Sequence, residues 1–260
     1  MKKPRLTKKT YFDDKKSYWS ASQYKQFCDC ESKAMAEIRG EYERPASNAL
    51  TIGSYIDTAL TEPKMMEQFI KSHPEMFKKD GTLKAEFVKC DEMIDRAKRD
   101  RVFMEYLKGQ KQKIITFDLD GIPFKAKLDV YRKGERIVDL KTVKDMEYMY
   151  RAGEGRMSPI EYWRWTDQLA LYQYGIEQTT GDKLPCYLAI ITKETVPALY
   201  LVELDQEILD ASLNFVRSVM PRFDAIKSGI IEPEHCDNCD WCKATKIITE
   251  PVKFSEMIDL

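Results

Sequence analysis

Residues 113–144 have the sequence KIITFDLDGIPFKAKLDVYRKGERIVDLKTVK. Within this stretch, two apolar runs rich in β-branched residues meet at Asp120-Gly121, a dipeptide that favours the backbone conformations of a tight hairpin turn. A third run, residues 136–143, follows a second turn signal at Lys133-Gly134. The pattern therefore predicts three consecutive strands joined by tight turns.

Charged residues interrupt the second and third of these strands. Asp129 lies at the end of the second strand, and Asp139-Leu140-Lys141 lies within the third. Because strand side chains alternate between faces, Asp139 and Lys141 share one face and Leu140 points to the other. One interpretation is that these charged side chains are simply solvated on an exposed face of the strand. The other is that the two carboxylates and the ammonium bind Mg²⁺ and a phosphodiester at one edge of the sheet. Burying an unpaired carboxylate in an otherwise apolar strand is energetically unfavourable, and a bound metal ion would remove that cost.

The composition limits the class of protein. The chain has 260 residues, of which 43% are hydrophobic and 33% charged, which is enough for one large domain with a substantial core. Its net charge of −1 gives no global attraction for a polyanion, so any nucleic acid must contact local basic patches. No apolar run is long enough to span a membrane and no signal peptide is evident, so we expect a cytoplasmic protein without membrane contact.

Periodicity and turn residues predict the remaining elements. The predicted helices cover residues 20–39, 48–60, 84–99 with an extension toward 107, 160–179 and 206–228. Two further strands are predicted at residues 186–192 and 198–204, and residues 146–159 are predicted to form a loop. This order of elements is typical of an α/β fold with a mixed central sheet flanked by helices.

The acidic residues suggest a metal site. Oxygen ligands suit Mg²⁺, and bound Mg²⁺ activates water for phosphodiester hydrolysis. We expect Asp129 and Asp139 to be metal ligands, with the carbonyl of Leu140 as a third. Lys141 is expected to orient or deprotonate the attacking water and to stabilise charge on the phosphate. Asp57, in a predicted helix, either completes the acidic cluster or is an exposed helix residue.

Other polar residues are expected near this site. Gln168 and Tyr172 lie four residues apart and therefore share one helix face, where we expect them to position the substrate. The alternative for Tyr172 is an ordinary aromatic residue of the core. Four basic residues either contact phosphates or are simply solvated: Lys125, Lys127, Lys144 and Arg151. The basic segment 1–17 either contacts nucleic acid or is a solubilising tail.

A cysteine cluster near the end of the chain suggests a second metal site. Cys236, Cys239 and Cys242 are separated by two-residue gaps, a spacing that lets their sulfurs face one centre in zinc and iron–sulfur proteins. Cys30 is the expected fourth ligand, and the adjacent His235 is an alternative for zinc. The site is expected to be structural, so that metal binding contributes to folding.

The motifs around the acidic residues resemble the PD-(D/E)xK nuclease superfamily. Asp129 and Asp139-Leu140-Lys141 are similar to its signature, although Leu128 stands where the superfamily has proline. Gln168 and Tyr172 are similar to the Gln-x-x-x-Tyr motif of the RecB/RecE-like branch.

The first two predicted helices extend the resemblance to phage exonucleases of the exonuclease VIII type. Ser20-Ala-Ser-Gln23 opens the first helix and Gly53-Ser-Tyr-Ile-Asp57 lies on the second, although relatives usually have His at the position of Asp57. The resemblance implies a restriction-endonuclease-like nuclease domain over residues 18–246, between a basic tail (1–17) and a C-terminal tail (247–260). It places a helical insertion at about residues 62–110 and a cysteine clip at residues 30 and 236–242.

The function implied by this resemblance is a Mg²⁺- or Mn²⁺-dependent DNA exonuclease. Such enzymes digest linear duplex DNA from its ends, without sequence specificity and in the 5′ to 3′ direction, as ring-shaped oligomers. They work with a RecT-like single-strand annealing protein in phage-type recombination, and a phage or prophage gene in a bacterial host is therefore expected. RecB-type relatives also imply a [4Fe–4S] cluster at the four cysteines, with Zn²⁺ as the alternative. Two other functions stay open: a catalytically silent DNA-binding or scaffold protein, and a structure-specific or CRISPR-adaptation-type nuclease.

Overall fold

A computed structural model describes residues 6–7, 10–12, 15–45, 48–151, 153–251 and 253. The chain forms two compact units, one of Met1–Ser22 with Pro45–Met220 and the other of Gln23–Arg44 with Pro221–Leu260. We call them unit 1 and unit 2. In the described part of the chain, no helix is both long enough and apolar enough to cross a lipid bilayer.

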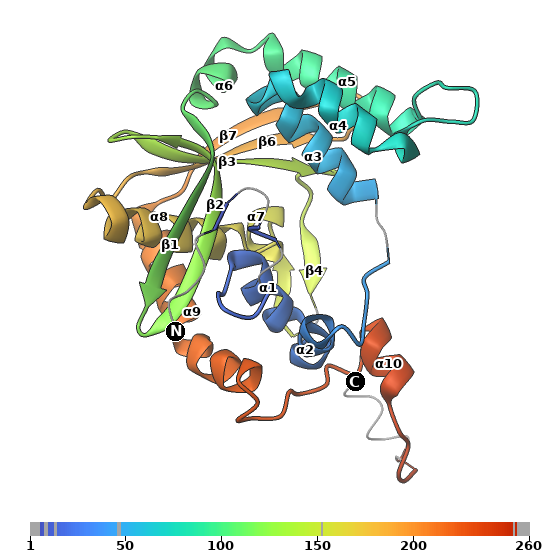
Figure 1. Cartoon of the computed structure of the whole chain (residues 1–260), viewed down its shortest axis with the longest axis vertical. Coiled ribbons are helices and arrows are strands. Elements are labelled where there is room, and N and C mark those ends of the chain that lie inside the picture. Colours follow the sequence, from blue (N-terminus) through green and yellow to red (C-terminus); the bar gives the residue numbers. More distant parts are fainter. Residues whose placement is uncertain are drawn as a thin grey trace. The chain divides into compact units, whose positions relative to one another are not determined.

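The elements of both units are labelled in Figure 1. The helices are α1 (Ala21–Asp29), α2 (Glu31–Arg39), α3 (Asn48–Thr61), η1 (Pro63–Met65), α4 (Met66–Ser72), η2 (Pro74–Met76), α5 (Ala85–Lys98), α6 (Arg101–Tyr106), α7 (Pro159–Tyr162), α8 (Trp165–Thr180), α9 (Gln206–Lys227) and α10 (Asp240–Thr245). The strands are β1 (Gln110–Leu119), β2 (Ile122–Arg132), β3 (Arg136–Val143), β4 (Met149–Arg151), β5 (Gly155–Met157), β6 (Cys186–Thr192) and β7 (Leu199–Glu203).

Unit 1 is built on a five-stranded sheet with the order β1-β2-β3-β6-β7. Strands β3 and β6 are parallel and the other neighbours are antiparallel, so the sheet is mixed, as predicted. The first hairpin turns at Asp120 and Gly121, whose φ angles of 53° and 91° are the left-handed conformations that this dipeptide favours. The three predicted strands are confirmed, with β1 beginning three residues earlier than expected.

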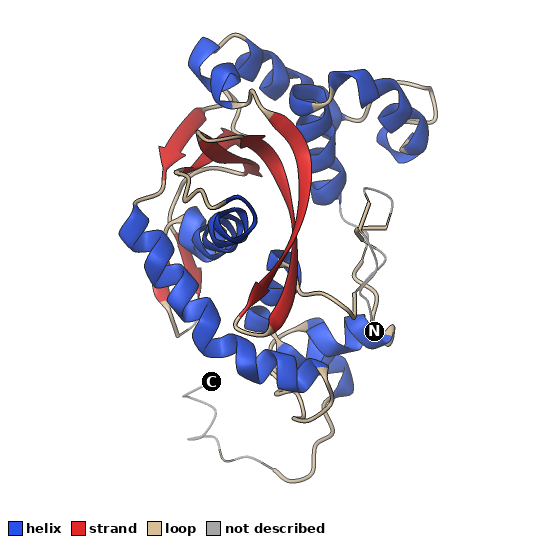
Figure 2. Ribbon diagram, turned by 60° about the vertical axis from the view of Figure 1, so that its left-hand side comes forward, coloured by secondary structure: helices blue, strands red, loops and turns tan. Residues whose placement is uncertain are grey.

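Helices cover both faces of this sheet. Val138 and Leu140 of β3 share a hydrophobic core with residues of α3 and α5. On the other face of β3, Asp139 and Lys141 contact Gln168 of α8. Figure 2 shows the strands as one strongly curved sheet with helices on both sides. The alternation of side chains therefore directs apolar residues of β3 toward α3 and α5, and charged residues toward α8.

Helix α8 lies close to β1 because residue 175 is glycine. A Cβ atom at Gly175 would lie 2.6 Å from Cδ1 of Phe117 and 2.8 Å from Cδ1 of Ile115, both of which are buried. Such distances are too short for carbon atoms, so a larger residue would force the helix and strand apart.

Gly175→Ala is therefore expected to lower the free energy of unfolding by about 1–3 kcal/mol, as overpacking of a core does. Gly53→Ala in α3 is the matched control, because its Cβ would approach only Oγ1 of Thr142, at 3.9 Å. Alanine at that position is expected to stabilise the helix by about 0.5–1 kcal/mol. Thermal or urea unfolding measures both, and equal stabilities for the two variants would contradict this packing.

Three predicted helices are interrupted in the structure. The extension of the helix 84–99 toward 107 is a separate helix, α6, because Asp100 has an extended backbone and caps α6. The helix predicted over residues 20–39 is two helices, α1 and α2, because Cys30 has an extended backbone and is the N-cap of α2. The helix predicted over residues 160–179 is also wrong as a single element. Its first turn is α7, and Arg164, with a left-handed φ of 50°, separates α7 from α8.

The predicted loop 146–159 is also wrong in part, because it contains a small hairpin of β4 and β5. Each strand has only three residues, which is too short for a detectable period of two. The hairpin is followed by α7, which begins at a capping box formed by Ser158 and Glu161, with Pro159 at its first position.

Unit 2 is held together by an aromatic cluster and an ion-pair network. The ring of Phe223 packs against those of Tyr24 and Phe27, at centroid distances of 6.3 and 5.4 Å. The guanidinium of Arg222 donates two hydrogen bonds of 2.8 and 2.9 Å to the carboxylate of Glu31. This geometry is the bidentate pairing that makes Arg–carboxylate bonds strong.

The predicted tails lie partly outside the described residues, which omit 1–5, 8–9, 13–14, 252 and 254–260. Within the described part of segment 1–17, Tyr11 is buried and its carbonyl accepts a hydrogen bond from the ammonium of Lys125 on β2. This part of the segment therefore packs against the sheet of unit 1.

Candidate functional site

A pocket of about 870 Å³ lies in unit 1 beside the end of β3. Its wall includes Asp57 from α3, Gln112 from β1, Asp129 from β2 and Lys141 from β3. Its lining also includes four large apolar side chains that are exposed: Phe12, Leu50, Tyr148 and Trp163. Of the predicted site residues, Asp57, Asp129, Leu140, Lys141 and Tyr172 thus line one cavity, whereas Asp139 and Gln168 are not part of its lining.

Asp139, Lys141, Gln168 and Tyr172 form one hydrogen-bonded network. The ammonium of Lys141 lies 2.6 Å from Oδ2 of Asp139. The Gln168 amide joins these two residues, because its Oε1 accepts from Lys141 at 3.3 Å and its Nε2 donates to Oδ1 of Asp139 at 3.1 Å. Nε2 of Gln168 also lies 3.0 Å from the Tyr172 hydroxyl. Gln168 and Tyr172 are buried; Gln168 contacts the charged pair and Tyr172 contacts Gln168, so the structure brings the four predicted residues together.

Asp57 and Asp129 form a second group beside the first. Nε2 of Gln112 lies 2.9 Å from Oδ2 of Asp57 and 3.4 Å from Oδ1 of Asp129. The other oxygen of each carboxylate is also engaged: Oδ2 of Asp129 accepts from the backbone N–H of Leu140 at 3.0 Å, and Oδ1 of Asp57 accepts from Thr61 at 3.2 Å. The backbone of Leu140 thus contacts Asp129.

Burial makes these carboxylates costly to ionise. Burial raises the pKa of Asp129 well above its ordinary value, and the nearby charges of Asp139 and Asp57 raise it further. Burial likewise raises the pKa of Asp57 to about 6. Lys111 is close enough to attract both carboxylates, but its own pKa is lowered by burial. The cluster therefore has the electrostatic character of a site that needs an additional cation.

The residues present fit a divalent metal ion. Three buried or half-buried carboxylates share the site, and the direct ion pair between Lys141 and Asp139 neutralises only one of them. Hard carboxylate oxygens of this kind are the ligands that Mg²⁺ and Mn²⁺ prefer. The three carboxylates are spread more widely than the cysteine sulfurs described below, since they do not form a group whose ligand atoms all lie within 4.8 Å in the described residues.

We expect the stabilisation of the protein by Mg²⁺ or Mn²⁺ to be greater at pH 8 than at pH 5. The folded-state pKa values of Asp57 and Asp129 lie above the unfolded value of about 3.9. Without metal, the folded state therefore binds more protons than the unfolded state, and the contribution of Asp57 to stability is lost as the pH rises from about 4 through 6. A metal ion binds the ionised carboxylates, so at pH 5 it must displace a proton from Asp57 that is largely absent at pH 8.

Melting temperatures measured with and without metal at the two pH values test this expectation. The variant Asp57→Asn should reduce the difference between the two pH values, because it removes one of the competing protonation sites. If metal raised the melting temperature equally at pH 5 and pH 8, this would contradict the expected competition between metal binding and protonation of the carboxylates.

Gln112 is a site residue that the sequence did not predict. It is buried and has a left-handed φ of 51°. The register of the flanking pairs, Lys111 with Val130 and Lys113 with Leu128, places Gln112 opposite Asp129. Glycine is the usual residue for such a conformation. The Gln112 amide contacts the two carboxylates.

Gln112→Gly is expected to raise the metal concentration for half-maximal activity by about 10–100-fold, the usual effect of losing a residue that orients metal ligands. Because glycine tolerates the left-handed backbone, the melting temperature should fall little. The matched control is Gln110→Ala, at an exposed position of the same strand. An unchanged metal requirement in Gln112→Gly would show that the amide does not position the carboxylates.

The four basic residues predicted to contact phosphates have different surroundings. Lys125 fits neither prediction, because it is buried and bonded to the Tyr11 carbonyl. The guanidinium of Arg151 donates to the carbonyl of Tyr162 and to the carboxylate of Glu154. Lys127 and Lys144 line the pocket, and the Lys144 side chain is 91% exposed. The last two remain candidates for contact with a polyanion.

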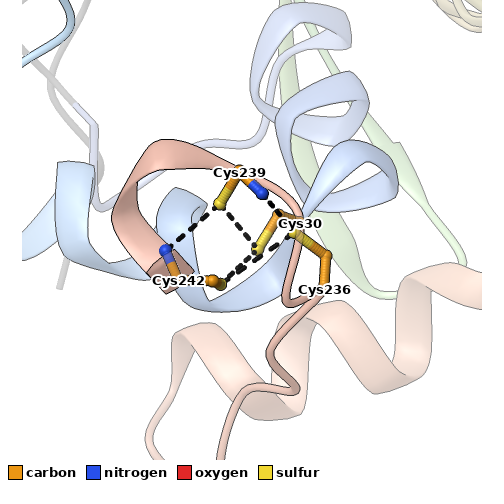
Figure 3. A group of neighbouring side chains, drawn as sticks. All are labelled: Cys30, Cys236, Cys239 and Cys242. Atoms are coloured by element: carbon orange, nitrogen blue, oxygen red, sulfur yellow. Dashed lines mark hydrogen bonds between the residues drawn. The ribbon is translucent and has the colours of Figure 1, made fainter. Parts of the chain in front are cut away.

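The predicted cysteine site is assembled within unit 2. The sulfurs of Cys30, Cys236, Cys239 and Cys242 all lie within 4.8 Å of one another, and Figure 3 shows the four side chains converging. Cys30 comes from the N-terminus of α2, and the other three come from the segment that leads into α10. Four thiols this close are a chemically suitable set of ligands for a metal ion.

Comparisons with known proteins show the family of the chain and a similar solved structure. Residues 20–245 match a family described as "PDDEXK-like domain of unknown function (DUF3799)". The chain is also similar to the crystal structure of a "putative exonuclease" from Eubacterium rectale, with 35% sequence identity, a TM-score of 0.91 and 98% of each chain covered. A search of curated proteins found no match.

Proposed function

The chain belongs to the family of PDDEXK-like domains, as its motifs predicted, and from this premise we propose that it is a metal-dependent nuclease. The observation that carries the proposal is the contact of 2.6 Å between Lys141 and Asp139 beside a pocket that Asp129 also lines. We propose that Asp129 and Asp139 hold the metal ion, with Asp57 and the Leu140 carbonyl as further ligands.

The chain supplies the groups that phosphodiester hydrolysis needs. A bound Mg²⁺ or Mn²⁺ supplies charge neutralisation and lowers the pKa of water. Lys141 lines the pocket, where its ammonium is positioned to bind a phosphate oxygen or the attacking water. Asp139 and Gln168 fix the ammonium in place from the interior side, and Tyr172 fixes Gln168. Gln168 and Tyr172 are thus positioning residues in this proposal.

We propose DNA as the substrate, and exonucleolytic digestion of linear duplex ends as the reaction. The description of the similar Eubacterium rectale protein and the motif resemblance both support this choice. The resemblance also supports 5′ to 3′ polarity, a ring-shaped oligomer, a RecT-like annealing partner and a role in phage-type recombination. The pocket is lined by lysines suited to contact with phosphates, which carry no sequence information, so we propose binding without sequence specificity.

The proposal is tested with the full-length chain, Mg²⁺ or Mn²⁺, and two DNA substrates of the same sequence. One is a linear duplex labelled at either the 5′ or the 3′ end, and the other is a covalently closed circle. We expect release of the 5′ label before the 3′ label, no cleavage of the circle, and no reaction with a chelator. Cleavage of the circle at the same rate would favour a structure-specific endonuclease, and binding without hydrolysis would favour a silent scaffold.

A further inference from the structure

We propose that Cys30, Cys236, Cys239 and Cys242 bind a single tetrahedral Zn²⁺, and that the [4Fe–4S] cluster implied by the RecB-type resemblance does not fit this site. The inference concerns unit 2 alone and goes beyond the proposed nuclease function. It rests on the distances between the four sulfur atoms.

The sulfur spacing matches one zinc ion. Zinc–thiolate bonds of about 2.3 Å in a tetrahedron place the sulfurs about 3.8 Å apart. The Cys30 sulfur lies 3.5 Å from that of Cys242 and 3.8 Å from that of Cys239. The sulfurs of Cys236 and Cys242 are 3.9 Å apart. These three distances lie close to the edge of a zinc–thiolate tetrahedron.

The same spacing is too small for a [4Fe–4S] cluster. In that cluster, each thiolate binds a different iron and points outward from its own corner of the iron–sulfur cube. The thiolate sulfurs are therefore separated by the iron–iron distance and, in addition, by the divergence of two outward bonds. Here all four sulfurs lie within 4.8 Å of one another, which leaves room for one ion but not for four.

Backbone groups support the thiolates of such a site. The N–H of Cys239 donates to the sulfur of Cys236 at 3.3 Å, and the N–H of Cys242 donates to that of Cys239 at 3.4 Å. The N–H of Lys33 donates to Cys30 at 3.4 Å. Hydrogen bonds to ligand atoms orient them and stabilise their negative charge, so three of the four sulfurs are already oriented.

The ligand set is four cysteines and does not include His235. Nε2 of His235 contacts the Ser32 hydroxyl at 3.3 Å, and in the part of the chain that the structure describes, the close group consists of the four sulfurs only. Cys28, two residues before Cys30, also lies outside the group. These two residues provide matched controls.

Metal content of the anaerobically purified full-length protein tests the proposal. Cells are grown with both iron and zinc, and zinc, iron and acid-labile sulfide are measured per chain. We expect one zinc and a colourless protein. Iron with sulfide, a single iron ion, or a protein without bound metal would each overturn the assignment. Because metal content is measured without DNA, this outcome is independent of the result of the nuclease assay.

Variants then identify the ligands. Cys30→Ser should lose the zinc, whereas Cys28→Ser and His235→Ala should retain one zinc per chain. Zinc retained in Cys30→Ser, or lost in His235→Ala, would contradict the four-cysteine site. If Cys30→Ser is insoluble, replacing zinc by Co²⁺ in the wild-type protein provides the second test. Intense visible bands of tetrahedral cobalt–thiolate are expected, and their absence would overturn the proposal.

Discussion

Lys141→Ala is expected to lower the rate of DNA hydrolysis by about 10²–10⁴-fold, the usual effect of removing a group that acts on the reacting atoms. Lys141 both lines the pocket and contacts Asp139 through its ammonium. Its loss removes positive charge from the expected position of the phosphate. The rate is measured with end-labelled linear duplex at saturating Mg²⁺.

Stability must be followed in the same experiment, because Asp139 is only 2% exposed and would lose its ion-pair partner. Breaking a buried pair can cost about 3–5 kcal/mol, so a second variant, Lys141→Gln, retains a hydrogen-bond donor without the charge. The control is Lys71→Ala in α4, whose side chain is 73% exposed and is not part of the pocket lining. Folded Lys141 variants that digest DNA at the wild-type rate would refute the assignment of this site.

Cys239→Ser is expected to destabilise unit 2 by more than about 3 kcal/mol, because loss of a bound metal is among the few changes with effects of this size. The sulfur of Cys239 contacts that of Cys30 and also caps α10. Metal binding at such a site is coupled to folding. The expected result is a lower melting temperature and faster proteolysis within Pro221–Leu260, with hydrolysis by the remaining folded protein unchanged.

Cys28→Ser is the matched control, since Cys28 lies outside the group of four sulfurs. It should melt close to the wild-type temperature. Normal stability of Cys239→Ser together with lost nuclease activity would contradict a structural role for the cysteine site and would indicate a role in the reaction.

The strands were predictable because their signals are local. Alternating residues and the Asp120-Gly121 turn set the register of β1, β2 and β3 without reference to the rest of the chain. The helix breaks at Cys30 and Arg164 were not predictable from such signals, unlike the break at Asp100, a preferred N-cap residue. Cys30 is an uncommon N-cap residue and Arg164 an uncommon left-handed residue, so neither position has a composition typical of a helix end.

The site was predictable where one element determined it and unpredictable where two elements had to meet. Alternation on β3 placed Asp139 and Lys141 on one face, and helix spacing placed Gln168 beside Tyr172. The role of Gln112 depends on its left-handed backbone and on contacts with carboxylates from α3 and β2, which no pattern within β1 reveals. Lys125 was assigned wrongly because its burial depends on a distant residue, Tyr11.

The position of β3 inside the sheet has a consequence for how the protein can diverge. β3 pairs with β6 from Ile137 to Val143, so the backbone at Asp139 and Lys141 is held along that edge, whereas the pairing of β3 with β2 ends at Val138. Tyr148 and Trp163, at the mouth of the pocket, lie outside the five-stranded sheet. Relatives that act on different polymers are therefore expected to keep the β3 residues and to vary the chain between residues 145 and 163.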